Sequence, residues 1–386
     1  MKKRLVYLDY AATTPVDPRV IAAMEPYWGK FVGNTMSLHS QGMRASAAVE
    51  KVREIIARSI GAETEEIVFT GNATESNNLA LKGVAEANPL KKKILISSIE
   101  HDCVVESAKW LAGKGYEIKE IPVNRDGLID FEWLGRELTE EVLLVSVIHG
   151  NNEVGTIQDI GRIGSLCRAK GVLFHTDASQ SFGKVLIDVK EMEIDLLTAS
   201  SHKIYGPKGV AILYIRNGVA INPILHGGGH EGGVRSSTVN VPAIVGMGKA
   251  VEVCQNIRIS EGQNIRKLRD KLIKGILDKV EDCWLNGDAK NRLPNNVNIS
   301  FARVEGEGLL LELDVRGIEV STGSACSSRS LEPSHVLLAM GLTAPEAHGS
   351  IRFSLGRWTT EAEINYVLRV VPEVVAKLRK MSPFKK

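Results

Sequence analysis

Thr198-Ala-Ser-Ser-His-Lys203-Ile-Tyr-Gly-Pro-Lys-Gly209 places one lysine directly after a stretch that has the composition of a buried strand. Small hydroxyl residues and His202 flank Lys203, and a Gly-Pro turn follows. A reactive amine needs such a place, because partial burial disfavours its charged form and the strand end fixes its position. Taken alone, the pattern also fits a surface lysine after a strand. Other stretches of the sequence are therefore needed to distinguish a reactive lysine from a surface lysine.

Apolar runs and helical patterns alternate on both sides of this lysine. Most of the runs are rich in Val, Ile and Leu without polar alternation, which is typical of strands covered on both faces. A helix is expected over Met43–Ile60, where apolar residues recur at helical spacing. The alternation predicts an α/β fold with a mostly parallel sheet between helices. The expected strands are Glu66–Thr70, Lys93–Ser98, Val142–His149, Gly171–Asp177, Asp195–Ser201 and Val210–Ile215.

The pattern changes after about residue 250, where a long charged helix is expected over Glu261–Val280. Shorter strands and a final helix follow it, which together predict a smaller α+β domain with a boundary near Val251. The expected elements are strands over Asn295–Ala302, Ile318–Thr322 and Ser350–Leu355 and a helix over Thr360–Lys380.

Composition excludes several classes of function. The net charge of +2 over 386 residues gives no field that would attract nucleic acid. No apolar run approaches the roughly 18 residues of a membrane span, so no membrane association is expected. The five cysteines lie far apart in the sequence, which argues against a disulfide framework and a zinc site. We therefore expect a cytoplasmic protein without a structural metal.

Two further stretches carry chemistry. Phe174-His-Thr-Asp177-Ala-Ser-Gln180 ends an apolar strand with a carboxylate, at the edge where open α/β sheets bind ligands. Phe69-Thr-Gly-Asn-Ala-Thr-Glu-Ser76 follows another strand and opens a helix, so its backbone N–H groups suit a phosphate. Each also has an ordinary structural explanation, Asp177 as a helix N-cap and Gly71-Asn-Ala-Thr74 as a common turn before a helix.

Together the three stretches resemble fold-type I enzymes that depend on pyridoxal 5′-phosphate (PLP), in the class V aminotransferase branch. The resemblance narrows to the NifS/IscS cysteine desulfurases and covers nearly the whole chain. Besides Ser200-Ser-His-Lys203, the matching stretches are Tyr7-Leu-Asp-Tyr-Ala-Ala-Thr-Thr-Pro15, Ser37-Leu-His-Ser40, His149-Gly-Asn-Asn-Glu-Val-Gly155, Gly323-Ser-Ala-Cys326, Leu331-Glu-Pro-Ser334 and Ser350-Ile-Arg-Phe-Ser-Leu-Gly356.

The resemblance implies a role for each matching residue. Lys203 would hold PLP, Asp177 would pair with its ring nitrogen, and His101 would stack on the ring. Asn152 and Gln180 would contact the side of the ring that carries the hydroxyl group. The phosphate ligands would be Ala73, Thr74, Ser200 and His202 from one subunit and Thr238 from the second subunit of a homodimer.

The resemblance also implies a division of the chain. Residues 1–14 would form an N-terminal segment that packs with the small domain, residues 15–250 the large PLP-binding domain, and residues 251–386 the small domain with the catalytic cysteine loop.

Cys326 lies in Ser321-Thr-Gly-Ser-Ala-Cys326-Ser-Ser-Arg-Ser-Leu-Glu-Pro333, which offers few apolar side chains to fix it in place. A thiol that carries sulfur to an acceptor would benefit from such a setting, and it could transiently contact an iron–sulfur cluster. The other four cysteines fit small buried residues better. Arg352 stands in an apolar strand and matches an amino-acid carboxylate in shape and charge. We expect Arg352, with Asn152, to bind the substrate.

The implied reaction converts L-cysteine to L-alanine and leaves the sulfur as a persulfide on Cys326. The implied partner is an iron–sulfur scaffold protein or another sulfur acceptor. Two features depart from the family pattern: Gly232 replaces an arginine, and the chain ends at Lys386 without the longer tail of the housekeeping branch. A selenocysteine lyase or a class V aminotransferase on the same fold remains open, as does a non-catalytic assembly partner.

Overall fold

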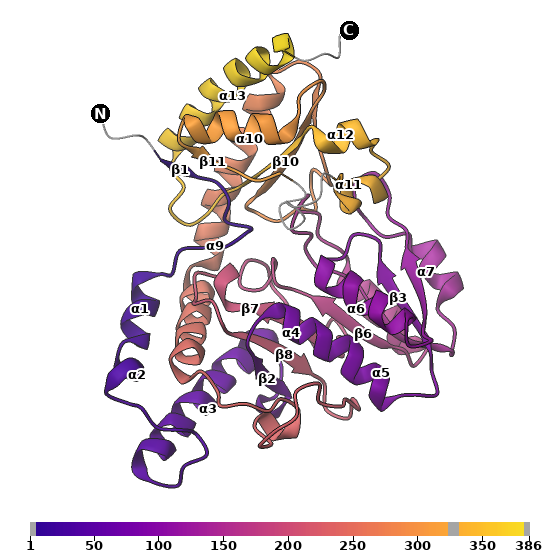
Figure 1. Ribbon diagram of the computed structural model, residues 1–386, viewed down its shortest axis with the longest axis vertical. Helices are drawn as coiled ribbons and strands as arrows, with labels where there is room; N and C mark the ends of the chain where they lie inside the picture. The colour runs from indigo at the N-terminus through magenta and orange to yellow at the C-terminus, as the bar shows by residue number, and fades with distance from the viewer. Residues whose placement is uncertain (1–4, 323–331, 382–386) are drawn as a thin grey trace.

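The computed structural model describes residues 5–322 and 332–381, and its larger part is built around a seven-stranded sheet (Figure 1). The strand order is β2-β8-β7-β6-β5-β3-β4, and all neighbours are parallel except at β8, which runs antiparallel to both β2 and β7. The α/β fold with a mostly parallel sheet is therefore confirmed. The strands are β2 (Ile67–Thr70), β3 (Lys93–Ser97), β4 (Glu117–Ile121), β5 (Val142–Ser146), β6 (Leu173–Asp177), β7 (Leu196–Ser200) and β8 (Ala211–Ile215).

Successive residues of these strands face two separate hydrophobic layers, as the period of two requires. Ile67 and Phe69 of β2 join the layer that contains α3 (Ser40–Ile60), α7 (Phe131–Glu137) and α8 (Ile160–Ala169). Val68 faces the opposite layer. That second layer contains α4 (Ala73–Asn78), the π-helical turn η2 (Leu79–Gly83), α5 (Val84–Ala87) and α6 (Asp102–Ala112).

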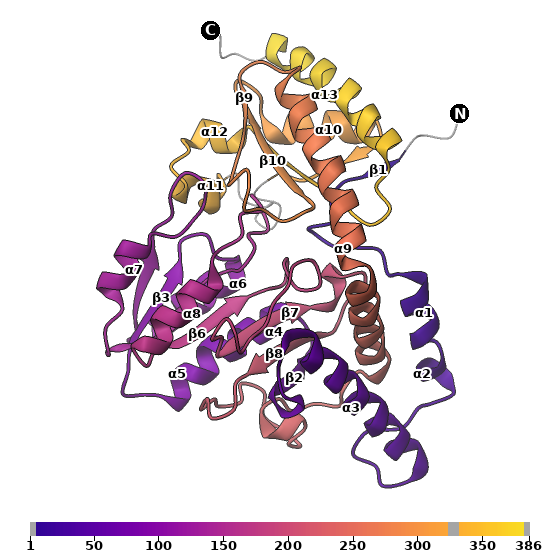
Figure 2. The same cartoon turned by 180° about the vertical axis from the view of Figure 1, so that it is seen from behind.

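A single long helix, α9 (Val241–Leu277), connects the large sheet to the smaller part of the molecule (Figure 2). Its first half packs in the core beside α3, and its second half packs in a separate core with α13 (Glu361–Met381). The charged helix predicted over Glu261–Val280 is thus only the second half of a longer one. The boundary predicted near Val251 lies inside this helix.

The smaller part contains a three-stranded antiparallel sheet in the order β12-β10-β9. Strand β1 (Val6–Tyr7) pairs in parallel with β11 (Ile318–Glu319), and Val6 and Leu8 lie in the same core as α13. Helices α1 (Pro18–Met24) and α2 (Pro26–Gly29) contact α9, and Val20 and Met24 of α1 lie in the core of the larger part. The other helices and strands that follow α9 are β9 (Cys283–Leu285), β10 (Asn296–Phe301), α10 (Gly306–Val315), α11 (His335–Ala339), α12 (Ala344–His348) and β12 (Ser350–Ser354). Among the described residues, no helix combines the length and apolar character that crossing a bilayer requires.

Candidate active site

The carboxyl ends of β6 and β7 place Asp177 and Lys203 at the same edge of the large sheet. Asp177 is the last residue of β6, and its backbone pairs with Thr198 of the parallel strand β7. Ser200 ends β7, and Lys203 is the last residue of the short 3-10 helix η3 (Ser201–Lys203) that directly follows this strand. The predicted strand-end positions are therefore those seen in the structure, where ligands of open α/β sheets bind.

Asp177 is held by two donors and is almost completely buried. Asn77 Nδ2 donates to Asp177 Oδ2 at 2.7 Å, and the backbone N–H of Ser179 donates to Oδ1 at 2.8 Å. Each carboxylate oxygen can accept more than one hydrogen bond, so the group can still bind a further donor. A buried carboxylate of this kind suits a protonated ring nitrogen.

Lys203 reaches the N-terminal segment of the chain. Its Nζ donates to the carbonyl oxygens of Ala11 at 2.6 Å and Ala12 at 2.8 Å. Gln180 Nε2 donates to the same Ala11 carbonyl at 2.8 Å. His202 Nδ1 lies 3.1 Å from Thr13 Oγ1, and burial, with nearby lysines, lowers the pKa of His202 to about 4. His202 is thus neutral near pH 7 and can act as a hydrogen-bond partner without adding charge.

His101 is the N-cap of α6 and connects to Asp177 through two neighbours. Its Nδ1 lies 3.1 Å from Cys103 Sγ, and Asn77 Nδ2 donates to that sulfur at 3.0 Å. Burial, and then the charge of Asp177, raises the pKa of Cys103 to about 12. Cys103 therefore stays a neutral thiol that bridges His101 and Asn77.

Ala73 and Thr74 begin α4, and the helical chain continues without a break through η2 and α5 to Ala87. Asn72 caps the first turn by accepting from the backbone N–H of Glu75 at 2.9 Å. Thr74 is exposed, and unpaired N–H groups at a helix start favour an anion. The helix start can therefore take a phosphate.

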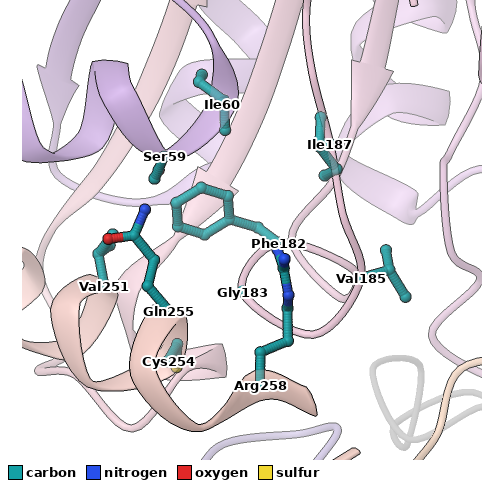
Figure 3. A pocket seen from close by; sticks show the side chains of 10 residues that line it. All are labelled: Ser59, Ile60, Phe182, Gly183, Val185, Ile187, Val251, Cys254, Gln255 and Arg258. Carbon is teal, nitrogen blue, oxygen red and sulfur yellow. The ribbon is translucent and has the colours of Figure 1, made fainter.

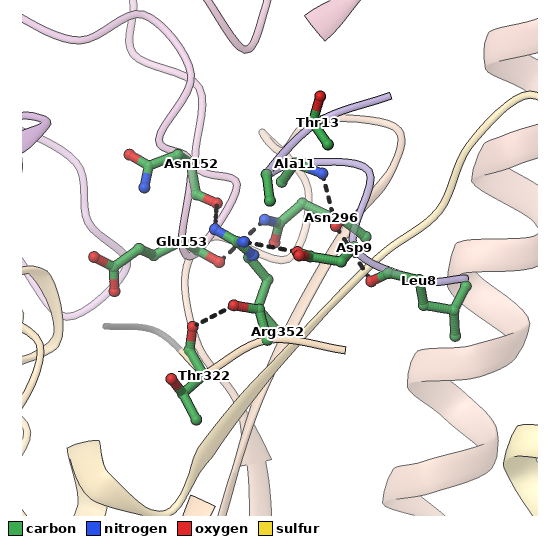
Figure 4. A network of polar contacts seen from close by, with 12 residues as sticks. Leu8, Asp9, Ala11, Thr13, Asn152, Glu153, Asn296, Thr322 and Arg352 are labelled. Atoms are coloured by element: carbon green, nitrogen blue, oxygen red, sulfur yellow. Dashed lines mark hydrogen bonds and ion pairs between the residues drawn. The ribbon is translucent and has the colours of Figure 1, made fainter. Parts of the chain in front are cut away.

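Arg352 belongs to β12 of the smaller part and contacts Asn152 of the larger part and Asp9 of the N-terminal segment (Figure 4). Its NH2 group donates to Asp9 Oδ1 at 2.9 Å, and its NH1 group donates to the backbone carbonyl of Asn152 at 3.0 Å. The guanidinium thus contacts the backbone of Asn152, and their joint role in substrate binding stays a prediction. The side chain of Arg352 is only 4% exposed, against 22% for Asp9.

The donors and acceptors at this edge fit PLP. Asn152 Oδ1 is buried without a hydrogen-bond partner among the described residues, so this position has unused hydrogen-bonding capacity. Asp177 can bind the ring nitrogen, Lys203 can hold the aldehyde carbon, and the start of α4 can hold the phosphate. No group of His, Cys, Asp and Glu suited to a metal ion occurs in the part of the chain that the structure describes.

Two predicted site residues are not brought into this group of contacts. Thr238 is exposed, in the loop between the 3-10 helix η4 (Glu231–Gly233) and α9. Its expected contact is with the second subunit's site, which a single chain does not contain. Cys326 lies outside the described residues.

The structure adds two polar residues that no sequence pattern singled out directly. Asn77 directly follows the stretch Phe69–Ser76, and Asp9 belongs to the stretch Tyr7–Pro15. Their position beside or inside these stretches is the only sequence signal that could have pointed to them, because their partners Asp177 and Arg352 are distant in sequence.

A small cavity beside the fold's long helix is not part of this site. It measures about 20 Å³, has room for about one water molecule, and is lined mainly by apolar side chains between α3 and α9 (Figure 3). Neither Lys203 nor Asp177 lines it.

Comparisons with known proteins agree with the geometry. The aminotransferase class-V family model matches residues 6–367. The cysteine desulfurase IscS of Dictyoglomus turgidum is 48% identical over 99% of this chain and 98% of its own length. A solved structure described as a NifS-like protein is 39% identical, with a TM-score of 0.91 over 97% of this chain and all of the other. A second, SspA in complex with cysteine, is 36% identical, with a TM-score of 0.81 over 92% of this chain and all of the other.

Proposed function

Because the chain belongs to the class V aminotransferase family, whose members use PLP, we propose that it is a cysteine desulfurase that supplies sulfur for iron–sulfur cluster assembly. The observation that carries this proposal is the shared attachment of Lys203 and Arg352 to one short segment. Ala11 and Ala12 bind Lys203, and Asp9 binds Arg352. The shared segment supports the proposal that Lys203 holds the cofactor and Arg352 binds the substrate carboxylate in one site.

Bound PLP supplies an electron sink for the carbanion that forms at the substrate's α carbon. Asp177 keeps the ring nitrogen protonated, with Asn77 and the Ser179 N–H fixing the carboxylate in place. Lys203 holds the cofactor and moves the α proton through its Nζ, and His101 assists. Ala73, Thr74, Ser200 and His202 bind the phosphate, and Asn152 and Gln180 orient the ring.

Arg352 binds the carboxylate of L-cysteine through charge-assisted hydrogen bonds. The Cys326 thiolate attacks the substrate sulfur, so that an S–S bond forms while the substrate's C–S bond breaks. The electrons of the C–S bond stay with the carbon, which takes up protons and leaves as L-alanine. Cys326 keeps the sulfur as a persulfide until an acceptor takes it.

The test is to incubate PLP-loaded protein with L-cysteine and a reductant and to measure L-alanine and sulfide together. Equal amounts are expected from wild type, and neither product from Lys203→Ala or Cys326→Ala. Cys283→Ala is the matched control, because this cysteine lies in β9, outside the site contacts described above, and should keep wild-type activity. Full activity of Cys326→Ala would overturn the persulfide mechanism and favour an aminotransferase or a lyase.

A homodimer completes the proposed site with Thr238 from the partner. Large apolar side chains are exposed along residues 21–43, which is unusual for a surface that stays in water. A cavity of about 180 Å³ joins this region to the loop before α9, since Met36 and Val239 both line it. The exposed residues are Ile21, Trp28, Val32, Met36, Leu38 and Met43.

Mixing two inactive variants tests this shared site. In a mixed dimer of Lys203→Ala and Thr238→Ala chains, one site combines an intact Lys203 with an intact Thr238 from the partner. Equal amounts of the two variants are unfolded and refolded together, so that the chains pair at random and half of the dimers are mixed. Each mixed dimer has one intact site of two, so activity should return towards a quarter of the wild-type level. Unchanged inactivity of the mixture would show that each chain uses its own Thr238.

The acceptor of the sulfur is proposed to be an iron–sulfur scaffold protein in the cytoplasm. A reducing compartment keeps cysteines as thiols, which the proposed chemistry of Cys326 requires. The four described cysteines are all free.

A further inference from the structure

The Arg352–Asp9 ion pair occupies the guanidinium on which the proposed substrate recognition depends. NH2 of Arg352 binds Asp9 Oδ1 at 2.9 Å, and NH1 binds the Asn152 carbonyl at 3.0 Å, as Figure 4 shows. Two of the three guanidinium nitrogens thus bind groups of the protein itself, and Nε is buried without a hydrogen-bond partner among the described residues. A carboxylate that binds a guanidinium through two hydrogen bonds uses NH2 together with either Nε or NH1, so an amino-acid carboxylate must share or replace the Asp9 contact at NH2.

The electrostatics favour replacement of Asp9 over sharing. Arg352 is nearly buried, where charge interactions are stronger than in water, and a second carboxylate close to Asp9 would be repelled. Glu153 also lies within electrostatic reach of Arg352, although burial raises the pKa of Glu153 to about 7. The negative charge that pairs directly with the guanidinium is therefore that of Asp9.

Asp9 can leave this contact without disturbing the chain around it. Its side chain is the more exposed partner, at 22%, and so it can turn toward water. Its backbone carbonyl is fixed separately, because it accepts from Tyr7 Oη at 3.1 Å and from the Ala12 N–H at 3.1 Å. Rotation of this one side chain removes the ion pair and leaves the backbone contacts of Asp9 in place.

We propose that Asp9 is a positioning residue that stands in for the substrate carboxylate on Arg352 and competes with it. In the absence of substrate, Asp9 keeps the buried guanidinium paired and in place. The substrate then binds only the fraction of molecules in which Asp9 has turned away, which weakens its apparent affinity. This inference rests on the proposed function, because it concerns the carboxylate of the same amino-acid substrate.

The test compares Asp9→Asn with wild type as PLP-loaded proteins. Asparagine keeps the shape and one acceptor but removes the competing charge. We expect KM for L-cysteine to fall about three- to tenfold, with kcat within about twofold of wild type, because only ground-state competition is removed. The inhibition constant of L-alanine, which has the carboxylate but no sulfur, should fall by the same factor.

Glu319→Gln is the matched control. Glu319 lies on β11 beside the N-terminal strand. Burial raises the pKa of Tyr7 to about 12, and Asp9 and Glu319 both raise it further. Unlike Asp9, Glu319 has no hydrogen bond or ion pair to Arg352 among the described residues. Its removal should leave KM and the alanine inhibition constant unchanged. An unchanged or higher KM in Asp9→Asn, with wild type active, overturns the competition alone. A wild type that makes no alanine overturns the proposed function and this inference together.

Discussion

Asn77 connects the carboxylate of Asp177 to the thiol of Cys103: its Nδ2 donates to Asp177 Oδ2 at 2.7 Å and to Cys103 Sγ at 3.0 Å. Asn77 is completely buried, and its Oδ1 has no hydrogen-bond partner among the described residues. One amide group therefore sets the orientation of the carboxylate proposed to bind the cofactor's ring nitrogen.

Replacing Asn77 with alanine should weaken that orientation without removing any group proposed to touch the substrate. We expect kcat for alanine formation to fall about 10- to 100-fold, in the range seen when a partner that orients a functional ligand is lost. The absorbance band of bound PLP should also shift, because the proton on its ring nitrogen is less well held.

Asn78→Ala is the control for this prediction, since Asn78 is the next residue of α4 and its Nδ2 donates only to the Thr74 carbonyl, at 2.8 Å. Near-wild-type activity and an unshifted band are expected. Equal effects of the two substitutions would mean that α4 was simply destabilised.

The described cysteines should react slowly with alkylating reagents in the folded protein. Burial raises the pKa of Cys103 and Cys167 to about 12 and that of Cys254 to about 11, and it also raises the pKa of Cys283. Because the thiolate is the nucleophile, few of these groups react at pH 7.5. Mass spectrometry after brief iodoacetamide treatment should find one fast label, on Cys326 and absent from Cys326→Ala. A fast label on Cys103 would contradict this account.

Several strands could be predicted because they are rich in Val, Ile and Leu, as Val142–Ser146 is. The strand β4 was missed, since Glu117-Ile-Lys-Glu-Ile121 mixes charged and apolar residues at the edge of the sheet, where only part of each side chain is covered. An edge strand pairs on one side only, and its composition is correspondingly less apolar.

The first half of α9 was missed for a different reason. Gly246 and Gly248 lower the helical propensity of this stretch by about 1 kcal/mol each relative to alanine. In the folded protein they allow close packing, because a Cβ on Gly248 would lie 2.7 Å from Val52 Cγ2 and one on Gly246 would lie 2.6 Å from Met24 Sδ. Tertiary contacts with α1 and α3 therefore decide a helix that local sequence disfavours.

The candidate site was predictable where a residue ends a strand, as Asp177 does, or closely follows one, as Lys203 does. The partners of these residues were not predictable in the same way. Asp9 and Arg352 are 343 residues apart, and their ion pair exists only because the N-terminal segment lies beside β12. Pairings of this kind depend on the whole fold.

Glu153 should make the protein less stable as the pH rises. Its Oε2 accepts from Ser334 Oγ at 2.5 Å, and burial raises its pKa from 4.5 to about 7. A carboxyl group whose pKa is raised by folding contributes stability below its unfolded pKa and loses it as the pH rises through its folded pKa. Glu153→Gln should therefore match wild type near pH 5 and exceed it at pH 8, by on the order of 1–3 kcal/mol in the free energy of unfolding.

Urea unfolding at the two pH values measures this difference, with Glu140→Gln as the control at an exposed position. Glu100, whose pKa burial raises to about 8, titrates in both proteins, so the comparison isolates Glu153. A variant that is equally destabilised at both pH values would instead indicate a lost hydrogen bond to Ser334.

Arg357 joins three parts of the chain in one buried cluster. Its NH1 binds Asp17 Oδ2 at 2.6 Å and its Nε binds Glu261 Oε1 at 2.6 Å, while the guanidinium lies 4.0 Å from the ring centroid of Tyr205. Arg357→Met would remove one positively charged partner from the carboxylates of Asp17 and Glu261, in surroundings that are largely shielded from water. We expect the free energy of unfolding to fall by about 3–5 kcal/mol, the cost of breaking a buried ion pair on one side.

The exposed pair Lys271–Glu361, also 2.6 Å long, provides the comparison for this last substitution. Water and salt screen such a pair, so Lys271→Met should cost less than about 1 kcal/mol. Unfolding of both variants in urea, with PLP bound, measures the two costs side by side. Arg19 is the main cause of the lowered pKa of Asp17, and Arg357 lowers it further. The deficit of Arg357→Met should therefore also shrink as the pH falls and Asp17 takes up a proton. Similar small losses in the two variants would mean that Asp17 and Glu261 are satisfied by other groups, with Arg19 sufficient for Asp17.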